Sequence, residues 1–158
     1  MTQRDDVARA LAFFNACDET VLLHQLIAEI APKAKRMVGQ MLAGGNEEAI
    51  PPPSELRAAR ESATKTEALQ TMRRTTDFAL LQVQARAIGQ RIETIEIAAS
   101  ADFPEGVRVT VPVTPTFPPP KARLSGTVEE TGTSLQVLLD NGETWNGPPS
   151  LARLEVAQ

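Results

Sequence analysis

Reactive side chains are scarce in this chain. It has one cysteine, one histidine and no tyrosine. Because Cys17 stands alone, the chain has neither an internal disulfide nor a cysteine-based zinc site. His24 lies beside the apolar stripe of a predicted helix with no nucleophile obviously paired to it, which favours a partly buried or interface histidine over a general base. These absences predict a protein that is not an enzyme and has no cofactor or metal.

Other common signals are also missing. Neither the Gly-x-Gly-x-x-Gly nor the Gly-x-x-x-x-Gly-Lys pattern occurs, which disfavours the common nucleotide enzymes. No apolar run approaches the roughly 18 residues of a membrane span, and the charged first residues do not begin a signal peptide. We therefore expect a cytoplasmic protein with no membrane partner.

Positive charge is not concentrated in any large segment. The net charge is −4. Residues 1–53 have 5 basic and 7 acidic side chains, residues 54–102 have 7 of each, and residues 103–158 have 4 basic and 6 acidic. A phosphate backbone is bound by a basic surface. This balance of charges disfavours nucleic acid, which is kept as the alternative partner.

The central third of the chain is almost free of helix breakers. From Ser54 to Ser100 there is no proline and one glycine. The stretch predicts one helix over 54–100, which would span on the order of 70 Å. Its later part carries two apolar seams at three- and four-residue spacing. One comprises Phe78, Leu81, Ala85, Ile88, Ile92 and Ile95, and the other Leu69, Met72, Ala79, Leu80, Val83 and Ala87.

Two shorter helices are predicted before it, at about 4–17 and 19–43. The apolar stripe of the first is Val7, Ala10, Leu11, Phe14 and Cys17, and that of the second is Leu23, Ile27, Ile30, Ala34, Met37 and Met41. The second stripe continues across Pro32, which favours one kinked helix over two. Gly44-Gly45 is a typical helix stop, the prolines of residues 46–53 predict an extended connector, and Ser54 is a plausible helix cap.

The two shorter helices are too short to cover both seams of the long one. If residues 4–43 fold back on one seam, the other leaves a large apolar patch. We therefore expect the chain to form a homo-oligomer through one seam, as in a coiled coil or multi-chain bundle. The residues assigned to this self-association are Phe78, Leu81, Ile88, Ile92 and Ile95.

The last third reads as short strands. Residues 107–111 alternate between apolar and polar, and Pro112 and Pro115 end that strand or place it at an edge. Asn141-Gly142 predicts a tight hairpin, because Asn-Gly readily supplies two positive φ values. Four or five such strands in this space resemble the small barrels of the Src-homology and Tudor type.

The predicted fold class is therefore α+β, with an N-terminal helical bundle and a small C-terminal β-barrel. Residues 1–102 form a helical oligomerisation domain, 103–120 a strand and proline-rich linker, and 121–158 the barrel, with the strand at 107–111 either preceding the barrel or belonging to it.

A few residues are candidates for binding. Trp145, beside the predicted hairpin, either fills the core of the barrel or anchors a partner protein, and Phe117 with Pro118–Pro120 is either a spacer or a binding surface. The basic clusters are Lys33, Lys35 and Arg36 in one helix and Arg73 and Arg74 in another. If they meet in the folded bundle, they make an acid-binding patch.

The leading hypothesis is a non-catalytic, oligomeric assembly or adaptor protein that binds another protein, as a scaffold or as an accessory subunit of a larger complex. It rests on an over-long apolar helix combined with few catalytic side chains. The alternative is a nucleic-acid-associated regulator that uses the basic helix clusters and the small barrel.

Overall fold

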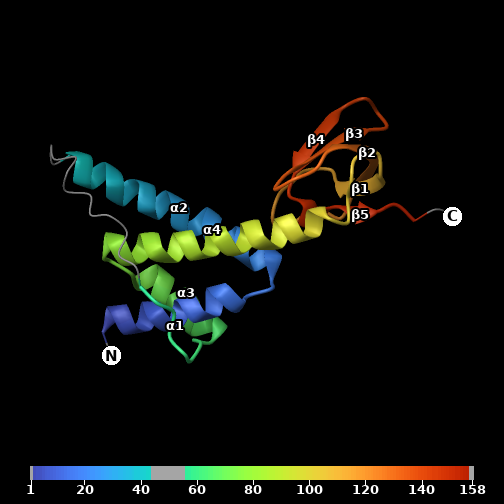
Figure 1. The fold of residues 1–158 in the computed structure, drawn as a ribbon. Coiled ribbons are helices and arrows are strands. Elements are labelled where there is room, and N and C mark those ends of the chain that lie inside the picture. The colour runs from blue at the N-terminus through green and yellow to red at the C-terminus, as the bar shows by residue number, and fades with distance from the viewer. Residues whose placement is uncertain (1, 44–55, 157–158) are drawn as a thin grey trace. The chain divides into compact units, whose positions relative to one another are not determined.

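The computed structural model describes residues 2–43 and 56–156 of the chain. Four helices pack as an N-terminal bundle and are followed by a five-stranded antiparallel sheet, which confirms the α+β class (Figure 1). The chain divides into two compact units, residues 1–91 and 92–158. The boundary falls within the last helix, α4 (Phe78–Ser100), rather than after it.

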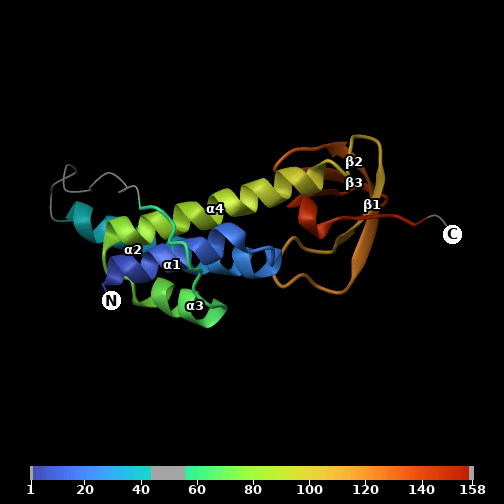
Figure 2. The ribbon, with the colours of Figure 1, turned by 60° about the horizontal axis from the view of Figure 1, so that its bottom comes forward.

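Helix α1 (Gln3–Ala16) begins at a capping box. The Thr2 hydroxyl accepts from the Asp5 amide and the Asp5 carboxylate accepts from the Thr2 amide, so two amides of the first turn are satisfied. The predicted stripe is confirmed, since its residues are buried: Val7, Ala10, Leu11, Phe14 and Cys17. Helix α1 lies beside α3 (Lys65–Arg74), as Figures 1 and 2 both show.

Helix α2 (Thr20–Ala43) runs through Pro32 as one element. Of the predicted stripe, Leu23 and Ile30 are buried, whereas Ile27, Ala34 and Met37 are half-buried; Leu26, which was not assigned to the stripe, is also buried. The continuous apolar register therefore predicted correctly that the proline does not end the helix. The predicted stop at Gly44-Gly45, the connector and the Ser54 cap lie outside the described residues.

The prediction of one long helix over 54–100 is wrong. Residues 56–64 are not helical, α3 begins at Lys65, and residues 75–77 separate α3 from α4. A second capping box explains the first boundary, because the Thr64 hydroxyl accepts from the Glu67 amide and the Glu67 carboxylate accepts from the Thr64 amide. Asp77 marks the second, since its carboxylate accepts from the Leu80 amide at 3.1 Å.

The turn between α3 and α4 is fixed by amide side chains. Gln3 donates to the Thr76 hydroxyl at 3.4 Å and accepts from the Asp77 amide at 3.2 Å. The fully buried Gln84 donates to the Thr75 hydroxyl at 2.9 Å. The Asp77 amide, which a continuous helix would bond along its own axis, is thereby satisfied by the Gln3 side chain.

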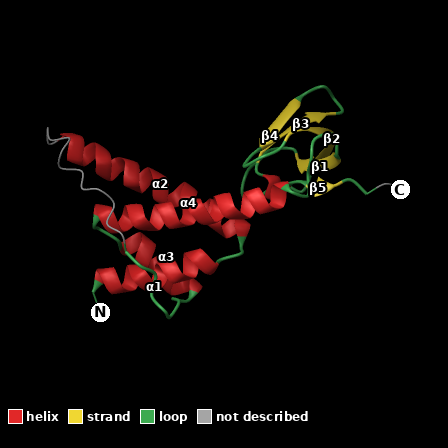
Figure 3. Ribbon diagram, viewed as in Figure 1, coloured by secondary structure: helices red, strands yellow, loops and turns green. Residues whose placement is uncertain are grey.

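The sheet of the second unit contains β1 (Arg108–Pro112), β2 (Arg123–Glu130), β3 (Leu135–Leu139), β4 (Thr144–Gly147) and β5 (Arg153–Leu154), in the order β4-β3-β2-β1-β5 (Figure 3). The short 3₁₀ helix η2 (Pro149–Leu151) precedes β5. β5 returns to pair with β1, at Val109 with Leu154 and Thr110 with Arg153.

The predicted closed barrel is not what the structure contains. Across residues 92–156, β4 and β5 remain the two edges, and no ladder joins them. β5 is only two residues long, and β4 only four, so each offers few backbone groups for closure. The sheet is therefore open.

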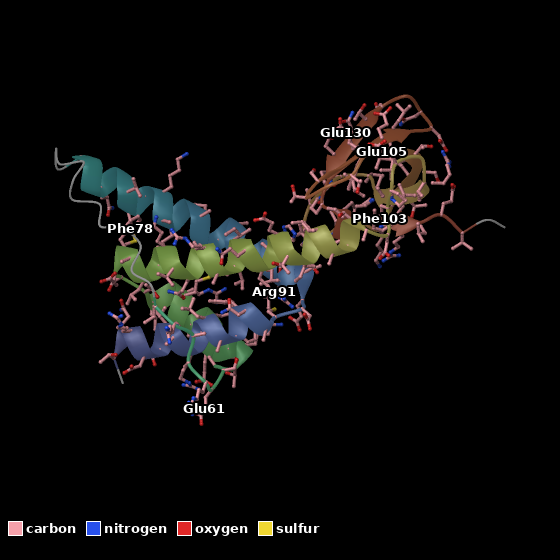
Figure 4. The ribbon with its side chains drawn as sticks, in the orientation of Figure 1. Glu61, Phe78, Arg91, Phe103, Glu105 and Glu130 are labelled. Atoms are coloured by element: carbon pink, nitrogen blue, oxygen red, sulfur yellow. The ribbon has the colours of Figure 1, made fainter. Side chains whose placement is uncertain are left out.

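One face of the sheet carries the core of this unit, which comprises Phe103, Val109, Val111, Val128, Leu135, Val137, Leu139, Trp145, Leu151 and Ala152. Phe103 follows the end of α4, where Figure 4 labels it. The last turns of α4 are tied to η2, because the buried Glu96 carboxylate accepts from the amide and the hydroxyl of Ser150. The α4 segment of this unit is thus part of its packing.

The segment predicted as a strand and proline-rich linker over 103–120 takes part in this fold, and its strand belongs to the sheet. β1 lies between β2 and β5, with Pro112 as its last residue, and Phe117 packs against the core. The predicted hairpin at Asn141-Gly142 is present, but only Gly142 has a positive φ, +89°. The Asn141 side chain instead accepts from the Glu143 amide at 2.9 Å, which forms the turn without a left-handed asparagine.

Candidate acid-binding pocket

A basic pocket lies between α2 and α3 in the first unit. Its volume is about 280 Å³. Two buried apolar side chains, Ile30 and Met72, contribute to its wall. The charged residues around them are Glu29, Lys33, Arg36 and Arg73. Three cations against one carboxylate give the lining two net positive charges, so the pocket has the composition that suits an acidic group with an apolar part.

Lys33 is held at the C-terminus of α3. Its Nζ donates to the main-chain oxygen of Arg73 at 2.9 Å and to that of Met72 at 3.3 Å. These are carbonyls of the last turn, which lack partners within the helix. The ammonium group also faces the negative end of the helix dipole. Lys33 therefore joins α2 to α3 and fixes one side of the pocket.

Arg73 is paired across the pocket with Glu29. Arg73 Nε lies 2.8 Å from Glu29 Oε1 and Nη2 lies 3.3 Å from Oε2, a two-bond contact. The hydrogen bond from Arg73 is the main cause of a lowered pKa of Glu29, and the same bond raises the pKa of Arg73. Both side chains are more than 40% exposed, so water screens the pair.

Arg36 differs from its two neighbours in the pocket. Among the residues described, it forms no ion pair and no hydrogen bond through its side chain. It stands one helical turn beyond Lys33 on α2 and lines the same cavity. A guanidinium is the side-chain group that best matches the two oxygens of a carboxylate or phosphate.

The predicted basic patch is assembled only in part. Lys33, Arg36 and Arg73 meet in the pocket, whereas Lys35 is exposed and does not line it. Arg74 lines a different cavity, of about 380 Å³, together with Asp6 and Glu67 of the α1–α3 side. Adjacent residues in a helix point in different directions, which separates Lys35 from Arg36 and Arg74 from Arg73.

Glu29 is the pocket residue that the sequence did not single out. It lies four residues before Lys33 on α2, a spacing that places the two on one helix face. Its position therefore suggests a pair with Lys33, but the structure pairs it with Arg73 from another helix.

The seam assigned to self-association lies largely inside the chain. Phe78, Leu81 and Ile88 are 7%, 0% and 0% exposed. They belong to the part of α4 in the first unit, where Figure 4 labels Phe78 at the beginning of the helix. Ile92 and Ile95, in the second unit, are half-buried. The first three residues are therefore core rather than a surface for a second copy, and oligomer formation stays a prediction.

The aromatic candidates of the second unit also belong to its core. Trp145 is 4% exposed, and its ring lies so close to the Gly147 backbone that a Cβ there would be 2.6 Å from Trp145 Cη2. Its indole Nε1 is buried without a hydrogen-bond partner in the described part of the chain. Phe117 is half-buried against the same core. The core interpretation of Trp145 is therefore confirmed, and neither ring stands free as an anchor.

The reactive residues are dispersed. Cys17 is a buried free thiol, and its main-chain oxygen accepts from Arg91 Nε at 2.8 Å. His24 is half-buried on α2. Within residues 2–43 and 56–156, no group of three or more His, Cys, Asp or Glu side chains is arranged to hold a metal ion. No described helix combines the length and apolarity needed to cross a membrane.

Comparisons with known proteins give no match: no family model, no curated protein and no solved structure is significantly similar to this chain.

Proposed function

We propose that the chain is a non-catalytic adaptor or accessory subunit whose helical unit binds an acidic segment of another protein in the pocket between α2 and α3. The observation that carries the proposal is that Arg36, which pairs with none of the described residues, lines a cavity that also has two buried apolar side chains. A carboxylate would pair with Arg36, and an apolar neighbour of that carboxylate would cover Ile30 and Met72.

The pocket favours a protein segment over nucleic acid. A phosphate backbone is bound by many cations along a groove, and here Lys33 already contacts α3 carbonyls while Arg73 is paired with Glu29. The chain as a whole is acidic, with a net charge of −4. A long polyanion would therefore be repelled beyond the pocket, whereas one acidic side chain can be accepted locally.

We also propose that the second unit is an open relative of the small barrels of the Src-homology and Tudor type. The return of β5 to pair with β1 supports this, because it leaves only the β4 and β5 edges to be joined for closure.

The decisive experiment is co-purification from the native cell with the tagged chain as bait and the partner identified by mass. Arg36→Glu is expected to weaken capture of that partner by about tenfold or more, because it replaces a charge-assisted hydrogen bond with a repulsion. Lys35→Glu is the matched control, since it makes the same charge change one residue away and outside the pocket.

Equal capture by the wild-type chain and the Arg36→Glu variant would remove the pocket from the proposal. A single-stranded oligonucleotide should be added to the purified chain at low salt as the competing test. Tight binding that weakens steeply as salt rises would favour the nucleic-acid alternative instead.

A further inference from the structure

The outer face of the sheet, opposite the core, carries three arginines. They are Arg108 on β1, Arg123 on β2 and Arg153 on β5. Their positions follow from the register, because Pro112 is opposite Arg123 and Thr110 is opposite Arg153. Residues directly opposite each other share a face, and so do residues two apart on a strand. Val109 and Val111 point to the core, so the three arginines share the other face.

Only one of the three arginines is neutralised. Arg108 binds two carboxylates: Nη1 and Nη2 lie 2.6 and 2.7 Å from the Asp140 oxygens, and Nε lies 2.9 Å from Glu155 Oε2. Neither Arg123 nor Arg153 forms an ion pair with any residue that the structure describes. Two positive charges of this face are therefore not paired with a carboxylate of residues 2–43 or 56–156.

Arg123 is held in place by neutral oxygens. Nε donates to the Thr110 hydroxyl at 3.1 Å, and Nη2 donates to the main-chain oxygens of Thr110 at 2.6 Å and Leu151 at 2.9 Å. The side chain thus crosses β1 and ends beside the start of β5, two residues before Arg153. The remaining nitrogen, Nη1, donates to none of the described residues.

The two guanidinium groups interact electrostatically. The pKa of Arg123 is lowered, first by its partial burial and then by the positive charge of Arg153. Like charges repel each other, and a bound anion relieves this repulsion. A monoanion neutralises one of the charges, whereas a dianion neutralises both.

We propose that Arg123 and Arg153 form a binding site for a phosphate-type dianion on the outer face of the sheet, with Arg123 Nη1 as the fixed donor and the exposed Arg153 as the second donor. A phosphate monoester has this charge near neutral pH, and its oxygens match the planar fork of donors that a guanidinium presents. This site lies in the second unit and is independent of the pocket between α2 and α3.

The test is a titration of the full ¹⁵N-labelled chain with inorganic phosphate in low salt at about pH 7.5, where phosphate is mainly the dianion. The side-chain Nε–H signals of Arg123 and Arg153, assigned from the variants below, should shift in a saturable manner in the millimolar range. Acetate is the monoanion control and should shift them less.

Arg153→Gln is expected to weaken phosphate binding by about fivefold or more, since it removes one of two charged donors. Arg57→Gln makes the same charge change in the first unit and should leave the affinity unchanged. Arg123→Lys keeps the charge but not the fork, and should weaken binding as well. Because Arg153 is exposed, its variant should fold even if the Arg123 variant does not.

A short neutral peptide with one phosphoserine separates the two sources of the group. Tighter binding of the peptide than of inorganic phosphate would identify a phosphorylated protein as the ligand, and the reverse would identify free phosphate. No saturable shift with either probe, equal shifts with acetate, or an equal effect of Arg57→Gln and Arg153→Gln would overturn the proposal.

Discussion

Leu81→Ala tests whether the apolar seam of α4 is an internal core or an interface. Leu81 is 0% exposed in the first unit, so the change removes buried methyl groups and leaves a cavity. Such substitutions cost about 2–5 kcal/mol, and about 3 kcal/mol is a reasonable value for this site. Each kcal/mol lowers Tm by roughly 4–8 °C in a domain of this size. We therefore expect a loss of about 12–24 °C.

The assay is thermal unfolding followed by circular dichroism at a helix wavelength, with light scattering on the same samples. Val21→Ala in α2 is the control within the same unit, because Val21 is 38% exposed and the removal of its methyl groups should cost much less. The reasoning is refuted if Leu81→Ala leaves Tm within about 2 °C of the wild type while the particle mass falls. Leu81 would then be an interface residue rather than core.

Four further changes follow from local geometry. Gly126→Ala should lower stability by about 1–3 kcal/mol, because its Cβ would lie 2.6 Å from the Leu138 main-chain oxygen; denaturant unfolding followed by Trp145 fluorescence measures this. Gly89→Ala in α4 meets nothing within 4 Å and should raise stability by about 0.5–1 kcal/mol in a helix-detected melt, so a loss there would contradict the described packing. Thr64→Ala should cost about 1 kcal/mol by removing the cap of α3, and Thr64→Ser should restore most of it. Arg108 lowers the pKa of Asp140 and of Glu155 mainly by its hydrogen bonds to them. The stabilisation from these pairs is therefore complete above about pH 5 and is lost as the pH falls through the lowered pKa values. Arg108→Gln should flatten the acid side of the plot of stability against pH, measured by Trp145 fluorescence, and an unchanged plot would contradict the pairing.

The helices show which part of the fold periodicity can predict. Apolar spacing located α1 and α2 and the buried residues of α1, because a repeat of three and four residues reports the face that packs. It failed between 56 and 77, where helix boundaries are set by single capping side chains. The sequence Thr64-Lys-Thr-Glu67 is a capping-box signature, and Asp77 precedes an apolar run, so the missed signals were present.

The sequence predicted the presence of several short strands, but it did not predict that the sheet they form stays open. Alternation and turn residues locate β1 and the hairpin at Asn141-Gly142, because both are properties of a few neighbouring residues. Whether β4 meets β5 depends on how many backbone groups each edge offers after the sheet has twisted. β5 pairs with β1 through two residues only, and the sequence around Arg153 and Leu154 contains no signal that predicts so short a strand.

Candidate anion sites depend on which cations the fold has already used. The sequence pointed to Lys33, Arg36 and Arg73 because basic neighbours stand out in a sequence, but Lys33 is occupied by α3 carbonyls and Arg73 by Glu29. Arg123 and Arg153 are isolated in the sequence, and they become neighbours because β1 pairs with both of their strands. The carboxylates of Asp140 and Glu155 pair with Arg108, and neither pairs with Arg123 or Arg153. Strand register and ion pairing, rather than clustering along the chain, therefore decide where positive charge remains available on this sheet.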